Sequence, residues 1–279
     1  MRDATFEALA RLALKATGQF ISPTRDYLVE ARLAHIVRRE GFGSTDDLAD
    51  CLKARPNPVF EAEIVAALLN HDSWFFRERD TLERVVDDIL PDRLRASKAG
   101  RLKVWCAGGG SGQEAYSLAI RLAELAHTPL GKARVQILST DVCRKSTEQA
   151  RAGLYGHFNV QKGLSVQRLL EHFERHESGQ WQISEAMRDR VSFREHNLMQ
   201  DCSGLGQFDL IFCRHALEGM ERQCRRDVAE RLAGQLAPGG VVLLGQDETL
   251  TGLTEALEPT HRFRGGWQIP AVQSTRSVA

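Results

Sequence analysis

The stretch RLKVWCAGGGSGQEAYSLAIRLAELAH, residues 101–127, decides the fold. It begins with a short apolar run rich in strand-favouring residues and continues through a glycine-rich turn at residues 108–112. It ends in a segment with helical periodicity that is apolar on most of its faces. A helix of that kind packs against a sheet instead of facing water. The stretch therefore predicts a strand, a tight turn and a covering helix.

The same alternation of strands and helices continues downstream. Further strands are predicted at residues 134–141, 191–197, 208–214 and 241–248, and helices at residues 146–155 and 223–236. Parallel neighbouring strands need crossover connections, and helices supply them. The sequence therefore predicts an α/β fold with a doubly wound, mostly parallel Rossmann-like sheet.

The region upstream has only helical patterns, and the last of them, at residues 81–90, is expected to end at Pro91. We expect an all-helical domain at residues 1–90, an α/β domain at 91–270, a small β insertion at about 172–186 and a polar tail at 271–279. The insertion is expected to be a hairpin around Gly179, because segments that can pair flank this turn residue.

Charge and composition exclude several classes of protein. The 279 residues hold 37 Lys+Arg and 37 Asp+Glu, whereas general nucleic-acid and anionic-membrane binders carry a basic excess. The apolar runs are too short to cross a bilayer and the N-terminus has no signal-peptide core, so we expect a cytoplasmic protein without membrane insertion. Six scattered cysteines indicate reduced thiols, and His172 and His176 lack a third ligand, so no metal is expected.

A ligand site is expected at the carboxyl ends of the strands, where the glycine-rich turn lies. Asp141 ends the second predicted strand, and a carboxylate there can accept hydrogen bonds from both ribose hydroxyls of a nucleoside. No P-loop lysine follows the turn, and Glu114 would repel a pyrophosphate at the start of its helix. S-adenosylmethionine, which has a positive centre and no phosphate, fits better. An NAD-dependent oxidoreductase is the weaker alternative.

Several long motifs resemble the CheR family of chemotaxis receptor glutamate methyltransferases, in the family's order and at about its spacings. They are WFFRERDTLERVVDDILP, VWCAGGGSGQEAYSLAI, STD followed by ARAGLY, the pair Asn197-Leu198, FDLIFCR, LAPGG and LLGQDE. The segment YLVEARLAHIVRREGFGS is similar to the family's N-terminal domain. The resemblance covers most of the chain.

This resemblance implies methyl transfer from S-adenosylmethionine to glutamate side chains on the cytoplasmic part of chemoreceptors, with S-adenosylhomocysteine as product. The positions that match the family's cofactor residues are His71, Ser73, Arg77, Gly108, Glu114, Asp141, Asn197, Leu198, His215 and Ala216. Of these, Arg77 and His215 are the expected catalytic residues. The substrate carboxylate is already ionised at neutral pH, so orientation and exclusion of water are expected to supply the catalysis.

Several positions depart from the family pattern, among them Gln113 at a family glutamate and Ala115 at a family proline. His215 stands at one family asparagine, Gly219 at a tyrosine, and His71 at another asparagine, although Asn70 is one residue away. These departures leave open a degenerate member that binds the cofactor or a signalling partner with little or no methyl transfer. A methyltransferase for another substrate is also left open.

A row of arginines lies beside the apolar stripe of the second predicted helix. Its members are Arg25, Arg32, Arg38 and Arg39. The resemblance implies that an acidic chemoreceptor surface docks on them. A solvated flank whose arginine stems cover apolar surface is the equally weighted alternative.

Overall fold

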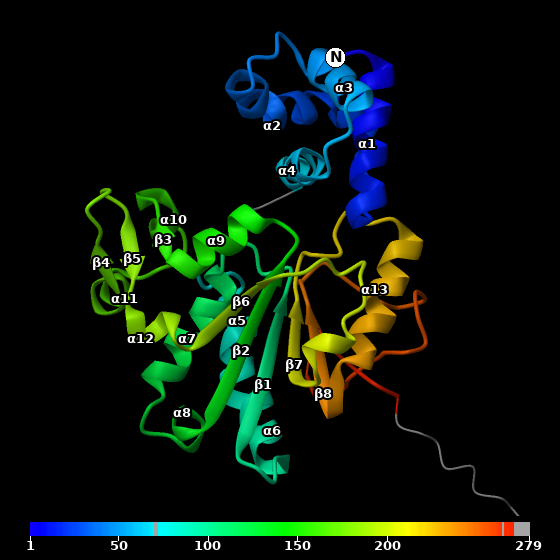
Figure 1. Ribbon diagram of the computed structural model, residues 1–279. Helices are drawn as coiled ribbons and strands as arrows, with labels where there is room; N and C mark the ends of the chain where they lie inside the picture. Colours follow the sequence, from blue (N-terminus) through cyan, green and yellow to red (C-terminus); the bar gives the residue numbers. More distant parts are fainter. Residues whose placement is uncertain (70–71, 264, 271–279) are drawn as a thin grey trace, which may run out of the picture.

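The computed structural model describes residues 1–69, 72–263 and 265–270. Figure 1 shows the first helices next to one end of a large sheet, with later helices on both faces of that sheet. The polar tail predicted at residues 271–279 lies outside the described residues. No described helix is both long and apolar enough to cross a membrane.

The N-terminal layer is entirely helical, as predicted. It consists of α1 (Asp3–Thr17), η1 (Pro23–Arg25), α2 (Asp26–Arg39), α3 (Thr45–Ala54) and α4 (Pro58–Leu68). Side chains such as Leu9, Leu33 and Ile64 form one hydrophobic cluster among these helices. Ser44 and Asn57 begin α3 and α4, because their side-chain oxygens accept backbone N–H groups of the first helical turn.

The next helical segment runs through Pro91, so the prediction that it ends there is wrong. It comprises α5 (Arg79–Arg84), the π-helical turn η2 (Val85–Ile89) and α6 (Leu90–Ala96). Pro91 lies in the first turn of α6, where a missing N–H is tolerated. Val85 and Ile89 pack with the core of the sheet and not with α1–α4. This segment therefore packs with the α/β part of the chain, although most of it lies before the predicted domain boundary at residue 90. The boundary itself stays a prediction.

The doubly wound, mostly parallel sheet is confirmed. Its strands are β1 (Arg101–Ala107), β2 (Arg134–Asp141), β6 (Val191–Glu195), β7 (Phe208–Cys213), β8 (Leu236–Leu244), β9 (Glu258–Pro259) and β10 (Gly266–Gln268). Among the described residues their order is β6-β2-β1-β7-β8-β10-β9. The first five of these pair in parallel, whereas β10 and β9 add antiparallel pairs that the sequence patterns do not predict.

Alternate residues of each central strand enter two separate cores, as a period of two requires. In β1, Val104 and Cys106 face one core, and Trp105 and Ala107 face the other. Helices α6 and α7 (Gln113–Glu124) cover the first face, and α13 (Arg222–Gly234) covers the second. Shorter elements are α8 (Pro129–Lys132), α9 (Arg144–Ala152) and η3 (Ser203–Leu205). Both faces of the sheet are therefore buried, and its strand ends are left for ligands.

The predicted β insertion is a small antiparallel sheet in the order β3-β5-β4. It contains β3 (Leu154–Tyr155), α10 (His157–Gln161), α11 (Val166–His172), β4 (Phe173–Arg175), β5 (Trp181–Ile183) and α12 (Glu185–Arg188). The hairpin around Gly179 is β4–β5, and β3 extends it. The ring of Phe173 meets that of Phe75 edge-on, with centroids 5.4 Å apart. The insertion therefore packs directly on the segment that precedes α5.

Candidate functional site

The glycine-rich turn after β1 lies against the end of β2. The N–H groups of Gly108 and Gly109 both donate to the Thr140 carbonyl oxygen at 2.9 Å. A Cβ at Gly109 would lie 2.2 Å from the Ser139 Oγ, and one at Gly108 would lie 2.7 Å from the Ala216 Cβ. Gly108 also has a φ of 74°, which residues with a side chain rarely adopt. The turn therefore presents bare backbone at the strand ends.

Asp141 ends β2 beside this turn. Its carboxylate accepts the N–H groups of Gly110 and Cys143, both at 2.8 Å. These bonds fix the carboxylate at the edge of the sheet. A carboxylate offers about four acceptor positions.

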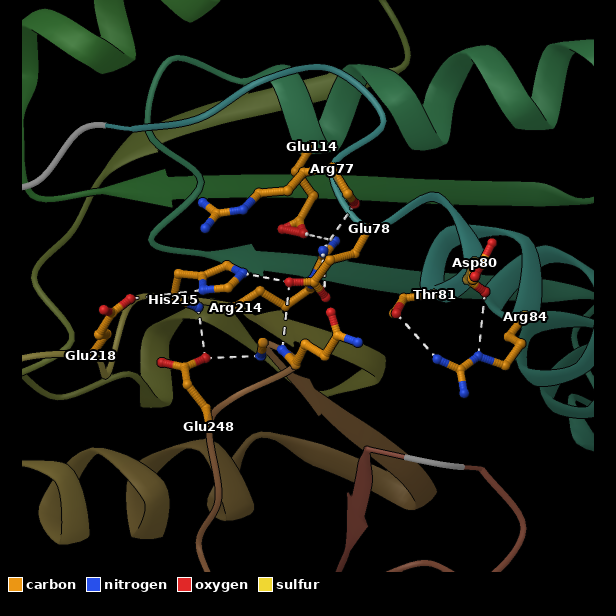
Figure 2. A network of polar contacts seen from close by, with 12 residues as sticks. Arg77, Glu78, Asp80, Thr81, Arg84, Glu114, Arg214, His215, Glu218 and Glu248 are labelled. Atoms are coloured by element: carbon orange, nitrogen blue, oxygen red, sulfur yellow. Dashed lines mark hydrogen bonds and ion pairs between the residues drawn. The ribbon is translucent and has the colours of Figure 1, made fainter. Parts of the chain in front are cut away.

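Arg214, directly after β7, joins two carboxylates. Figure 2 shows its guanidinium near Glu78 and Glu114, and it lies 3.0 Å from a carboxylate oxygen of each. Another of its N–H groups donates to the Arg77 carbonyl oxygen at 2.9 Å. The Arg214 side chain is 3% exposed, and no described residue accepts a hydrogen bond from its buried Nε. Arg214 thus ties the segment before α5 to the start of α7.

The two carboxylates respond differently to Arg214. Burial raises the pKa of Glu114, and Arg214 offsets only part of this effect. Burial acts in the same direction on Glu78, but Arg214 and His215 outweigh it, so the pKa of Glu78 is lowered. When ionised, these two carboxylates and that of Asp141, which borders the same cavity as Glu114, outnumber the guanidiniums of Arg77 and Arg214. Such a charge excess suits a cationic ligand.

His215 closes the same cluster from the loop after β7. Its Nε2 lies 2.7 Å from the Glu78 Oε1, and its backbone N–H donates to the Glu248 Oε2 at 2.6 Å. Glu248 also accepts the N–H groups of Gly245 and Leu217, at 2.8 and 3.1 Å. Both Glu78 and His215 have a positive φ, of 51° and 59°, which is costly for residues with a side chain. The surrounding contacts hold both turns in this conformation.

A cavity of about 570 Å³ lies between the N-terminal helices and the strand ends, within the size range of small-molecule sites. Its α/β wall includes Gly108, Asp141, Asn197, Leu198, His215 and Ala216, and its helical wall includes Gln19, Arg25, Leu28 and Arg32. A smaller cavity is bordered by Ser73, Arg77, Glu114 and Arg214, together with Gly108, Asp141 and His215. The last three residues border both cavities.

Asn197 links the N-terminal helical layer to the loop after β6. Its Nδ2 donates to the Ala16 carbonyl oxygen at 2.6 Å, and its Oδ1 accepts the Met199 N–H at 2.9 Å. The amide of this expected cofactor residue is therefore already used to hold α1 against the loop after β6. Its neighbour Leu198, 7% exposed, contributes apolar surface to the cavity.

Local contacts explain why residue 219, which departs from the family pattern, is a glycine. Its carbonyl oxygen accepts the Phe20 N–H at 2.8 Å, and Met220 pairs with Gln19 in an antiparallel bridge. Gly219 has a φ of 79°, and a Cβ there would lie 2.7 Å from the Gln19 Oε1. The Gln19 Nε2 donates to the Ala216 carbonyl oxygen at 3.3 Å. A side chain at residue 219 would therefore displace Gln19 from the wall of the cavity.

The structure brings together the predicted site residues that it describes. Ser73, Arg77, Gly108, Glu114, Asp141, Asn197, Leu198, His215 and Ala216 border one or both cavities. His71 lies outside the described residues. Sequence reasoning missed Glu78, Arg214 and Glu248, although they occur within the quoted motifs WFFRERDTLERVVDDILP, FDLIFCR and LLGQDE. Gln19 has no comparable signal, because its place depends on how α1 packs.

The arginine row does not form one uniform surface. Arg25 and Arg32 line the larger cavity, and burial lowers the pKa of Arg32. Arg39 instead lies 2.6 Å from Glu63 and 2.7 Å from Glu40. Arg38 is exposed near the end of α2. Only the first half of the row thus faces the candidate site.

The histidine pair of the β insertion does not form a ligand cluster. His172 is buried, with 7% exposed, whereas the His176 Nδ1 lies 2.9 Å from the Ser178 Oγ. Within the described ranges, no group of three or more His, Cys, Asp or Glu side chains is placed to hold a metal ion.

Comparison with known proteins identifies the family. The family model "CheR methyltransferase, SAM binding domain" matches residues 71–263, and "CheR methyltransferase, all-alpha domain" matches residues 4–70. The chain is 31% identical to "Chemotaxis protein methyltransferase Cher2" of Pseudomonas putida, over 90% of this chain and 92% of that one. It is 34% identical to "Chemotaxis protein methyltransferase 1" of Pseudomonas aeruginosa, over 91% and 93%.

Among solved structures, the chain is similar to the glycopeptide N-methyltransferase MtfA complexed with S-adenosyl-L-methionine. That similarity has a TM-score of 0.33 and 16% identity, over 57% of this chain and 54% of that one, and is too low to add to the assignment. The bare glycine backbone and the carboxylate excess at the strand ends fit a cationic nucleoside. S-Adenosylmethionine is the cofactor, and the chain belongs to the CheR methyltransferase family.

Proposed function

We propose that this methyltransferase esterifies glutamate side chains on the cytoplasmic part of chemoreceptors. The observation that carries the proposal is the shared cavity, since Arg25 and Arg32 of the helical layer face the same space as Gly108 and Asp141. A glutamate carboxylate attracted by the arginines would enter the cavity opposite the expected cofactor residues. The relatives' names as chemotaxis protein methyltransferases support this substrate class.

The cofactor is proposed to follow the strand ends. Asp141 accepts its ribose hydroxyls, and the loop of Asn197 and Leu198 flanks the adenine. Glu114 faces the sulfonium or ammonium end, and Arg77 binds the methionine carboxylate through its planar guanidinium. Ser73, Gly108, His215 and Ala216 complete the walls. The lining of the two cavities, which share Gly108, Asp141 and His215, supports this order.

Little acid or base catalysis is needed. When bound, S-adenosylmethionine supplies a methyl group on a positively charged sulfur, which leaves as the neutral thioether of S-adenosylhomocysteine. The accepting carboxylate is already ionised at neutral pH. The residues of this chain therefore orient the two partners and exclude water. His215 acts in this scheme by fixing the Glu78 and Arg214 cluster, because its Nε2 is held by Glu78.

Two measurements test the proposal. First, calorimetry compares S-adenosylhomocysteine binding to wild type, Asp141→Asn and Asp141→Ala. Loss of the charge and its hydrogen bonds should weaken binding by about tenfold to a hundredfold, since each hydrogen bond to a charged group contributes about 1.5–3 kcal/mol. Unchanged affinity in both variants would overturn the site assignment.

Second, S-adenosylmethionine with a labelled methyl group is incubated with receptor-enriched membranes. The expected result is a base-labile methyl ester on the receptor, reduced in Arg25→Ala/Arg32→Ala at low salt. Cofactor binding without any ester would favour the alternative of a family member that binds but does not transfer. Label in another protein, in a base-stable bond, would point to another substrate.

A further inference from the structure

Arg77 reaches the smaller cavity from residues 72–78, which precede α5 and form no helix or strand. Its Nη1 donates to the Asp72 carbonyl oxygen at 2.9 Å. Its guanidinium carbon lies 4.3 Å from the centre of the Trp74 ring. The direction of Arg77 therefore depends on where the Asp72 backbone and the Trp74 ring are held.

Both of these anchors are contacted by Lys162 of the β insertion. The Lys162 Nζ lies 3.1 Å from the Asp72 Oδ1 and 3.9 Å from the centre of the Trp74 ring. Lys162 directly follows α10. At the next residue, Gly163, a Cβ would lie 1.8 Å from the Phe75 carbonyl oxygen. The insertion and the Arg77 segment thus meet backbone to backbone, with Lys162 beside the contact.

We propose that Lys162 and Trp74 are positioning residues for Arg77. Two cations over one aromatic ring are each attracted to its electron-rich face, and Asp72 offsets the charge of Lys162. The ring then restricts Arg77, and the β insertion influences cofactor binding without contacting the cofactor. The inference rests on the proposed cofactor contact of Arg77. Its test must therefore distinguish failure of the positioning role from failure of that contact.

The test measures the affinity for S-adenosylhomocysteine by calorimetry in wild type, Lys162→Met, Lys162→Arg, Arg77→Ala and the double variant Arg77→Ala/Lys162→Met. A surface cation–π contact or ion pair each changes an equilibrium by about twofold to fivefold. Lys162→Met removes both and should weaken binding by about threefold to tenfold. Lys162→Arg keeps both interactions and should stay within about twofold of wild type.

The double variant carries the decisive comparison. If Lys162 acts through Arg77, Lys162→Met should add nothing to the loss caused by Arg77→Ala. Independent, additive losses would overturn the proposal. So would an unchanged affinity in Lys162→Met when Arg77→Ala binds weakly, or an unchanged affinity in Arg77→Ala itself. In that last case a weakened Asp141→Asn would still leave the proposed cofactor site standing.

Arg175→Met is the matched control. Arg175 lies in the same insertion, with its guanidinium carbon 4.0 Å from the centre of the Trp181 ring, but it borders neither cavity. This variant should bind S-adenosylhomocysteine like wild type. An equal loss in Arg175→Met and Lys162→Met would show that the effect comes from the stability of the insertion and would overturn the positioning role.

Discussion

The Nε2 atom of His215 lies 2.7 Å from the Oε1 atom of Glu78, and both residues have a left-handed backbone conformation. The contact joins two strained turns whose residues are 137 positions apart in the sequence. Figure 2 shows Arg214 beside this contact, where it also reaches Glu114. Backbone strain of this kind collects where surrounding structure must hold functional groups in place. The two turns thus set the position of Arg214 at the candidate site.

Two substitutions of His215 measure the strain in its backbone conformation. His215→Ala should lower the free energy of unfolding by about 1–3 kcal/mol, because it removes the bond to Glu78 and keeps a Cβ at positive φ. His215→Gly also loses the bond but relieves the conformation, so it should be less destabilising than His215→Ala by about 1 kcal/mol. Urea unfolding measures both. If His215→Ala were more stable than His215→Gly, the strain in this turn would be contradicted.

Glu114 should make cofactor binding sensitive to acid. A raised pKa means that its carboxyl gains a proton at a higher pH than an ordinary glutamate. Its attraction for the sulfonium and ammonium of S-adenosylmethionine is therefore present above this raised pKa and is lost as the pH falls through it. Calorimetry between pH 5 and pH 8 should show affinity that declines with acid in wild type.

Glu114→Gln is the control for this acid effect. The variant should bind S-adenosylmethionine more weakly at neutral pH and lose the part of the pH dependence that Glu114 causes. It retains the carboxylates of Glu78 and Asp141 and the side chains of Arg77, Arg214 and His215 at the same site. A pH profile parallel to that of wild type would assign the effect to one of those groups instead.

Glu78 should affect stability in acid. Because Arg214 and His215 lower its pKa below the ordinary value, its contribution to stability is complete above the unfolded pKa of about 4.5. It is lost as the pH falls through the lowered folded pKa. Urea unfolding of wild type and Glu78→Gln should therefore show a gap in unfolding free energy at neutral pH that narrows below about pH 4.5. A constant gap across that range would rule out the lowered pKa.

Much of the fold can be predicted from local pattern. The alternation within β1 and the apolar faces of α7 encode a buried sheet covered by helices, and chain order then places Gly108 and Asp141 at the same edge. Strands β9 and β10 have two and three residues, too few for a periodic signal. Continuation of the helix through Pro91 depends on the π-helical turn before it, which no local pattern indicates.

The candidate site is predictable only where a residue's place follows from the strand order. Glu114 and Asp141 qualify, because one begins a helix and the other ends a strand at the expected edge. The pairing of Arg214 with Glu78 does not, since it brings together segments distant in sequence through side-chain directions that tertiary packing sets. Asn197 illustrates the same limit, because its amide holds Ala16 of the helical layer.

Restoring the family's tyrosine at residue 219 should destabilise this chain. Gly219→Tyr would place a side chain at a φ of 79° and a Cβ 2.7 Å from the Gln19 Oε1. Left-handed strain should lower the free energy of unfolding by about 1–2 kcal/mol, and crowding of the flexible end of Gln19 should add a smaller overpacking term. The double variant Gln19→Ala/Gly219→Tyr should regain the overpacking part and keep only the backbone strain. Urea unfolding separates these terms, with Gln19→Ala alone as the reference. If the double variant is no more stable than Gly219→Tyr, then Gln19 does not require the glycine.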